Sequence, residues 1–191
     1  MSKSRLEAFS DGVIAILITI MVLGFQVPHG ATWSALRTEL PLFLTYVLSF
    51  VFLGIYWTNH HHLFQAVKHV DGRVLWANLH LLFWLSLVPF ITGWVGETHL
   101  APVPTALYGV VFLLAGLAYT ILTRALLALH GQDSTLAKAL GRDWKGKISL
   151  ACYAAGVLVA TMWPRVAAGL YIVVAIIWLV PDRRIEKVLA G

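Results

Sequence analysis

The chain has 191 residues, of which 59% are hydrophobic and only 12% are charged. A soluble domain carries about 25% charged residues, so this composition excludes an ordinary soluble protein and indicates a polytopic membrane protein. The formal net charge of +5 is spread over the loops and forms no stripe with aromatic residues, which argues against a nucleic-acid-binding surface.

Six apolar segments predict six transmembrane helices, so the expected fold is an all-α membrane protein with a single domain over residues 1–191. Turn signals separate the segments, and Pro28-His29-Gly30 is the first of them. The last two segments are close to the lower length limit for a span. The expected helices cover residues 8–27, 41–66, 73–95, 104–129, 147–163 and 165–181.

The first segment combines a polar start with one apolar face. At about 100° per residue, an apolar stripe forms along it, from which Ser10 and Asp11 point away. A carboxylate in a membrane helix costs roughly 2.5–3.5 kcal/mol on insertion scales, so Asp11 is expected to have a hydrogen-bonding partner or to face water. The apolar stripe can pack on a neighbouring helix or meet copies of itself around a symmetry axis. It consists of Phe9, Gly12, Ile16, Ile20, Leu23 and Val27.

The distribution of basic residues predicts the orientation. With the amino terminus in the cytoplasm, only Arg37 and Arg165 of the 14 Lys and Arg residues lie outside. The positive-inside rule therefore favours an even number of spans with both termini cytoplasmic. The inner residues are Lys3, Arg5, Lys68, Arg73, Arg124, Lys138, Arg142, Lys145, Lys147, Arg183, Arg184 and Lys187.

Polar residues gather at the cytoplasmic ends of the first three helices, at one depth. Because the hydrocarbon offers no water, they are expected to bond to one another, with Asp11 accepting from His, Trp or Asn donors. For Trp57 and Trp76, an interfacial aromatic belt is an equal alternative. The residues concerned are Ser10, Asp11, Trp57, Asn59, His60, His61, His62, Trp76, Asn78 and His80.

The start of the first helix, Arg5-x-x-x-Phe9-Ser10-Asp11, resembles the RxxxFSD signature of the transmembrane protein 175 family. These are potassium-permeable channels of endosomes and lysosomes, with a shorter bacterial branch. Trp57-x-x-His60, and Asn78-Leu79 followed by Pro89-Phe90, resemble the second-helix and third-helix elements of that family. The resemblance covers roughly half of the chain.

The resemblance implies that the first helix lines a pore and that Ile16, Ile20 and Leu23 form its constriction. It also implies that a polar network braces the pore helix without touching the ion. Animal members carry two six-helix repeats and this chain shows one, so a homotetramer in the bacterial inner membrane is expected. The implied bracing residues are Arg5, Phe9, Ser10, Asp11, Trp57, His60, Trp76, Asn78 and His80.

Such a pore would select modestly for potassium. No TVGYG-like run is present, so a hydrophobic ring would replace the usual carbonyl filter and could gate by dewetting. Thr19 lies about 60° from Ile16 around the helix, and a small rotation would bring its hydroxyl into the lumen as an ion ligand. Potassium is then the permeant ion, with no cofactor and no soluble partner expected.

The same residues also bear on a metal site, a hydrolase and a transporter. A metal site at His60-His61-His62 is disfavoured because consecutive helical side chains diverge by about 100°. The single cysteine, Cys152, offers no disulfide or CxxC site, and the absence of GxSxG and HExxH motifs disfavours a hydrolase. The remaining alternative is a proton-coupled secondary transporter, with Asp11 and the histidines as its relay.

Overall fold

A computed structural model of the chain describes residues 2–131, 134, 136–137 and 143–179, and every regular element within these ranges is a helix. The predicted all-α class is confirmed. The predicted end of the last helix at Pro181 lies outside the described residues, as do five of the inner basic residues. These five are Lys138, Arg142, Arg183, Arg184 and Lys187.

The helices follow the hydropathy of the chain closely. Helix α1 continues into a short 3₁₀ turn, η1, and a loop with the short helix α2 leads into α3. Pro89 cannot donate a backbone hydrogen bond, and the apolar stretch around it is divided into α4 and α5 near this position. The bounds are α1 Lys3–Ile20, η1 Met21–Gly24, α2 Trp33–Thr38, α3 Leu40–Gln65, α4 Gly72–Ser86, α5 Val88–Glu97, α6 Pro102–His130, α8 Trp144–Ala160 and α9 Pro164–Leu179.

Helix lengths separate two groups of spans. Among the described residues, four helical stretches are long and apolar enough to cross a membrane. Helix α8 has 17 residues and α9 has 16, which at 1.5 Å each gives about 24–26 Å, less than the hydrocarbon thickness of about 30 Å. Over the described residues, α8 and α9 are therefore shorter than the four long stretches. The four long stretches are Lys3–Gly24, Leu40–Gln65, Gly72–Glu97 and Pro102–His130.

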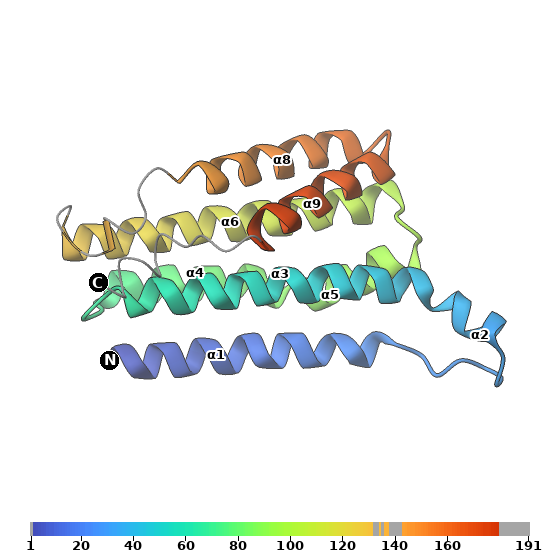
Figure 1. The fold of residues 1–191 in the computed structure, drawn as a ribbon, viewed down its shortest axis with the longest axis horizontal. Helices are drawn as coiled ribbons and strands as arrows, with labels where there is room; N and C mark the ends of the chain where they lie inside the picture. The colour runs from blue at the N-terminus through green and yellow to red at the C-terminus, as the bar shows by residue number, and fades with distance from the viewer. Residues whose placement is uncertain (1, 132–133, 135, 138–142, 180–191) are drawn as a thin grey trace.

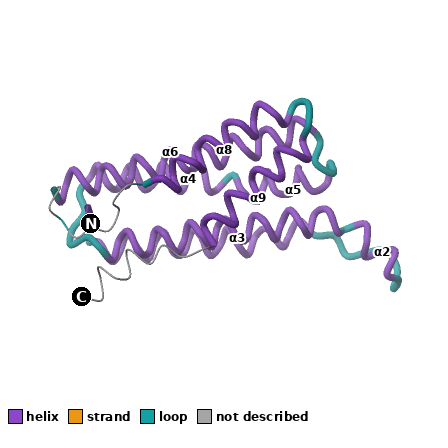
Figure 2. The backbone as a smooth tube through the Cα atoms, turned by 45° about the horizontal axis from the view of Figure 1, so that its top comes forward, coloured by secondary structure: helices purple, strands orange, loops and turns teal. Residues whose placement is uncertain are grey.

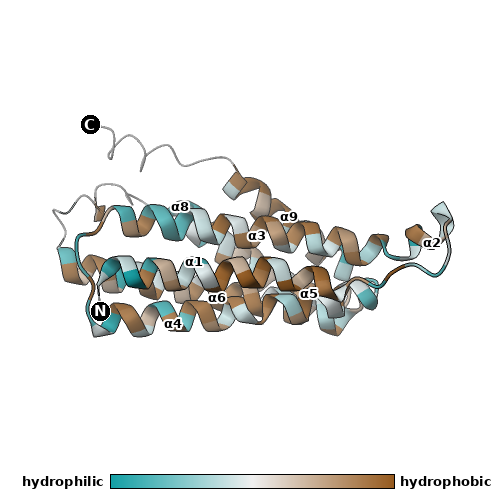
Figure 3. Cartoon of the chain, turned by 90° about the horizontal axis from the view of Figure 1, so that it is seen from below, coloured by the Kyte–Doolittle hydropathy of each residue, from teal (hydrophilic) through white to brown (hydrophobic). Residues whose placement is uncertain are grey.

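The helices lie side by side as an elongated bundle, with α1 along one edge and α6, α8 and α9 on the opposite side (Figure 1). Helix α1 contacts α3, α4 and α5, whereas α6 contacts α4, α5, α8 and α9. The short helix α2 extends beyond the end of the bundle that lies away from the N-terminus (Figure 2). Apolar residues make up much of the length of the helices (Figure 3), and many large apolar side chains are exposed, as expected of a chain whose solvent is lipid.

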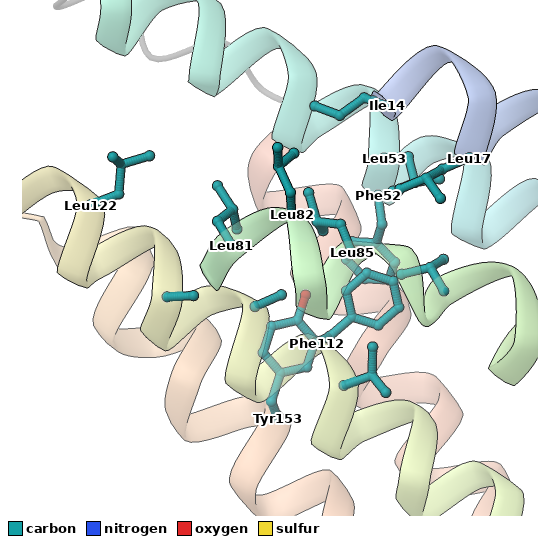
Figure 4. Close-up of a cluster of buried hydrophobic side chains, with 14 of the residues drawn as sticks. Ile14, Leu17, Phe52, Leu53, Leu81, Leu82, Leu85, Phe112, Leu122 and Tyr153 are labelled. Carbon is teal, nitrogen blue, oxygen red and sulfur yellow. The ribbon is translucent and has the colours of Figure 1, made fainter. Parts of the chain in front are cut away.

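An aromatic cluster joins the two sides of the bundle. The rings of Phe52 in α3 and Phe112 in α6 have centroids 4.4 Å apart, and Phe112 stacks on Tyr153 of α8 at 6.0 Å. Leu85 of α4 lies beside them and is fully buried (Figure 4). Because these rings come from three helices, the cluster fixes α6 and α8 against the α3–α4 pair.

Close helix packing predicts one sensitive glycine. A Cβ at Gly96 would lie 2.6 Å from the Cα of Leu42 in α3, while nothing lies within 4 Å of a Cβ at Gly93 in the same helix. Gly96→Ala should lower the free energy of unfolding by about 1–3 kcal/mol, because a backbone clash must separate α3 from α5. Thermal unfolding in detergent measures this. Gly93→Ala is the control and should be neutral or slightly stabilising; equal melting temperatures for the two variants would contradict the packing.

Candidate functional site

Helix α1 has two opposite faces. Its buried face packs on α3 and α4 and consists of Leu6, Ser10, Ile14, Leu17 and Met21. The apolar stripe lies on the other face, where Ile16 is 61% exposed and Leu23 is 80% exposed. Nothing lies within 4 Å of a Cβ built at Gly12, so this face is open along its length. Within one chain, the described residues leave the apolar stripe without a covering helix.

Thr19 lies beside the apolar stripe and is exposed. Its hydroxyl donates to the carbonyl oxygens of Ala15, at 3.1 Å, and Ile16, at 3.0 Å, within its own helix. Among the described residues none donates a hydrogen bond to this oxygen. The hydroxyl hydrogen is therefore engaged while the oxygen lone pairs remain able to accept a cation.

Behind α1, three side chains form a buried chain of hydrogen bonds, here called the Asn78 network: Ser10, Asn78 and His60. The Asn78 amide nitrogen donates to Ser10 Oγ at 2.9 Å, and Ser10 Oγ donates to the Leu6 carbonyl at 2.9 Å. Asn78 Oδ1 lies 2.8 Å from His60 Nε2. The bond to Ser10 identifies the Asn78 amide nitrogen, so the atom that faces His60 is the Asn78 amide oxygen, which can only accept. His60 therefore carries a proton on Nε2 and donates it to this oxygen.

The Asn78 network ties three helices together. Ser10 of α1 and Asn78 of α4 have no exposed surface, and His60 of α3 is 1% exposed. In a medium without water, each of these polar groups would cost free energy if left unbonded. The network therefore fixes both the distance of α1 from its neighbours and its rotation about its own axis.

Asp11 belongs to a second, outer arrangement. The indole nitrogen of Trp57 donates to Asp11 Oδ1 at 3.0 Å. Trp57 is 45% exposed, and its ring stacks on His61 with centroids 6.1 Å apart and an interplanar angle of 17°. His61 lies 2.8 Å from the Gln65 side chain. The carboxylate thus has an indole donor on the flank of the α1–α3 contact.

The structure separates the expected single cluster into these two arrangements. Trp76 is 75% exposed, and His80 accepts a hydrogen bond from Trp84 of the same helix at 2.9 Å. Trp76 and His80 lie outside the two arrangements. Asn78 points from α4 toward α1, and each of these residues is two positions from Asn78, so its side chain points about 160° away from that of Asn78. Arg5 is exposed, and Phe9 is 51% exposed on the apolar stripe.

The other polar residues of this region have local roles. The Asn59 side chain donates to the Ile55 carbonyl of its own helix at 2.8 Å. His62 Nδ1 is buried and has no hydrogen-bond partner among the described residues. In the same ranges, no three His, Cys, Asp or Glu side chains are placed so that they could share a metal ion.

A second buried polar chain was not predicted. In the half of the bundle away from the N-terminus, Thr92 Oγ1 of α5 donates to Ser49 Oγ of α3 at 2.7 Å, and Ser49 lies 3.0 Å from the hydroxyl of Tyr108 in α6. Each hydroxyl stands alone in an apolar run. Thr45 and Ser49 are four residues apart and so lie on the same face of α3. This spacing is the one feature of the sequence that indicates a polar face on α3.

Comparison with known families identifies the first half of the chain. The sequence model of the family described as Endosomal/lysosomal potassium channel TMEM175 matches residues 5–89. That range begins with Arg5, extends to the start of α5, and contains the whole Asn78 network and the apolar stripe.

Two relatives and one solved structure extend the similarity. A potassium channel of Chryseobacterium sp. (strain P1-3) is 52% identical over 187 residues, covering 98% of this chain and 97% of that protein. The endosomal/lysosomal proton channel TMEM175 of Gallus gallus is 42% identical over 101 residues, which are 47% of this chain and 20% of that protein. The crystal structure of a lysosomal potassium-selective channel TMEM175 homologue from Chamaesiphon minutus is similar with a TM-score of 0.79 and 28% identity, over 93% of this chain and 96% of that chain.

The Asn78 network predicts a stability difference between two asparagines. Asn78→Ala should lower the free energy of unfolding by about 1–3 kcal/mol, because the buried His60 Nε2 loses its acceptor and Ser10 Oγ loses its donor. Thermal unfolding in detergent is the measurement. Asn59→Ala serves as the control, since it removes only a bond within one helix turn. A loss as large in Asn59→Ala as in Asn78→Ala would contradict the bracing role.

Proposed function

The chain belongs to the TMEM175 family of potassium channels, and on that premise we propose that four copies of it form a potassium-conducting pore lined by α1. The observation that carries the proposal is the exposed apolar stripe, which no described helix of the same chain covers. The chain is a multi-pass membrane protein, so the stripe faces either lipid or other copies of itself. The similarity to named potassium channels over nearly the full length favours the second arrangement.

Four copies around an axis would bring the apolar stripes together. Residues spaced at i, i+4 and i+7 on one helix face form successive rings when identical helices surround a symmetry axis. The rings of Ile16, Ile20 and Leu23 would then be the narrowest part of the pore. Aliphatic side chains offer an ion no ligands, so this constriction would close by expelling water and would select only modestly.

Thr19 would supply the oxygen ligand closest to the constriction. Its hydroxyl hydrogen is engaged by Ala15 and Ile16, so the lone pairs are oriented away from the helix backbone. A small rotation of α1 would bring these lone pairs to the ion path. A ring of four hydroxyl oxygens favours the cation whose hydration shell is removed at lower cost, which is potassium.

The Asn78 network would hold each pore helix in place. Since Ser10, Asn78 and His60 are fully buried on the side of α1 opposite the apolar stripe, they set which residues face the axis. Asp11 and Trp57 would add a second support at the same end. We infer that these residues contact no permeating ion.

The proposal extends to cellular placement and cofactors. Both termini would lie in the cytoplasm, and the bacterial inner membrane is the expected location. The relatives are channels, which supports a protein that is not an enzyme, and the proposal includes no resident cofactor or metal.

The proton-coupled transporter is less well supported. Asp11 and His60 lie in two different hydrogen-bonded arrangements, so a proton would not pass directly from one to the other. The relative from Gallus gallus is named a proton channel. If this chain conducts protons, uncoupled flux through a channel is therefore better supported than coupled transport.

Ion flux through purified protein in liposomes tests the pore. Wild type should give fast potassium flux without a pH gradient, and Ile16→Asn should lower the potassium-over-sodium preference several-fold because a polar ring hydrates the constriction. Ile121→Asn is the control, because Ile121 in α6 is 48% exposed and lies off the apolar stripe. Slow, saturable flux that requires a pH gradient would establish a carrier instead.

Substitutions at Thr19 test the oxygen ligand. Thr19→Val keeps the shape but removes the oxygen, and it should lower the potassium-over-sodium permeability ratio several-fold. Thr19→Ser keeps the oxygen and should retain the ratio. Bi-ionic potentials of the reconstituted channel give both values, and an unchanged ratio in Thr19→Val would exclude Thr19 as an ion ligand.

A further inference from the structure

A large cavity lies at the end of the bundle opposite the N-terminus, away from the α1 stripe. Its volume is about 410 Å³, within the range of roughly 300–1,000 Å³ that is usual for small-molecule sites. Leu44 and Leu48 of α3 and Ile172 of α9 are among its apolar walls. Neither the apolar stripe nor the Asn78 network contributes to the lining, so the cavity has no role in the proposed pore.

Within the part of the chain that the structure describes, two polar groups that line this cavity have no side-chain partner. Arg165 is exposed and lies in the first turn of α9, where the helix dipole disfavours a cation. Thr105 is 1% exposed, and its hydroxyl has no hydrogen-bond partner among the described residues. Neither Glu39 nor Glu97, which are close in sequence to lining residues, is among the lining side chains. The cavity therefore offers a cation beside apolar walls, while the Thr105 hydroxyl lies buried behind its surface.

The surroundings of the cavity indicate its depth in the membrane. Trp163 precedes α9 by one residue and is 60% exposed, next in sequence to the helix that carries Arg165. Tryptophan is enriched at the membrane–water interface. At that depth, Arg165 lies at the level of lipid headgroups, while the leucine and isoleucine walls extend along α3 and α9 into the hydrocarbon.

We propose that this cavity binds an anionic phospholipid. The lipid phosphate pairs with the Arg165 guanidinium, a bidentate match for phosphate. One acyl chain lies along Leu44, Leu48 and Ile172. A free phosphate ion would pair with Arg165 but would leave the apolar walls of the cavity without contacts. A phospholipid fills both parts of the cavity, so it is the better fit.

Native mass spectrometry of the detergent-solubilised protein tests this site. The probes are phosphatidylglycerol and phosphatidylcholine with the same acyl chains. Wild type should prefer phosphatidylglycerol by about fivefold, the effect of one basic residue at a lipid headgroup. Arg165→Gln should remove that preference, whereas Arg37→Gln, at an exposed arginine outside the cavity, should keep it. Equal binding of both lipids by wild type, or an unchanged preference in Arg165→Gln, would overturn the proposal.

A second pair of variants tests the acyl-chain groove. Ala168 lines the cavity, so Ala168→Leu should reduce phosphatidylglycerol binding several-fold, while Ala151→Leu on the exposed side of α8 should not. Unchanged binding in Ala168→Leu would remove the lipid from this groove. Displacement of the lipid by millimolar inorganic phosphate would identify free phosphate as the occupant and would also overturn the proposal. Because these measurements use no ion flux, their outcome is independent of the proposed pore.

Discussion

The position of the Asn78 side chain between Ser10 and His60 is the constraint on which the arrangement of α1 depends. An amide in the membrane interior must have both its donor and its acceptor satisfied. Here the amide nitrogen donates to α1 and the oxygen accepts from α3, while the residue itself belongs to α4. Rotating α1 by even one residue position would break the bond to Ser10, so a hydrogen-bond chain sets which face of α1 is turned away from the bundle.

This rotation of α1 about its own axis places its polar residues and its exposed apolar residues on different faces. The side of α1 that carries Ser10 is buried among α3 and α4, and the side that carries Ile16 and Leu23 is open. The proposed pore requires both properties, because the lumen face of α1 would have to remain free while its buried face is held firmly. Asp11 is bonded to the Trp57 indole on the flank, where the carboxylate is partly exposed and its desolvation is incomplete.

The remaining helices support this unit from behind. The Phe52, Phe112 and Tyr153 rings connect α3 with α6 and α8, and the Ser49–Tyr108 hydroxyl contact repeats the connection nearer the other end. The large cavity lies where α3 and α9 face each other beyond that contact. A lipid in this place would fill the seam between α3 and α9 without contacting the apolar stripe of α1.

The sequence by itself determined the helical class, the approximate spans and the apolar stripe, because hydropathy and a period of 3.6 residues are local properties of the chain. It also placed Ser10, His60 and Asn78 at one depth. Only the tertiary structure decided that His60 bonds to Asn78, that Asp11 bonds to Trp57, and that Trp76 and His80 bond to neither arrangement. The Thr92–Ser49–Tyr108 hydrogen-bond chain and the cavity beside Arg165 were also evident only in the tertiary structure. The physical reason is that bonding between helices depends on their relative rotation and crossing, which no single segment encodes.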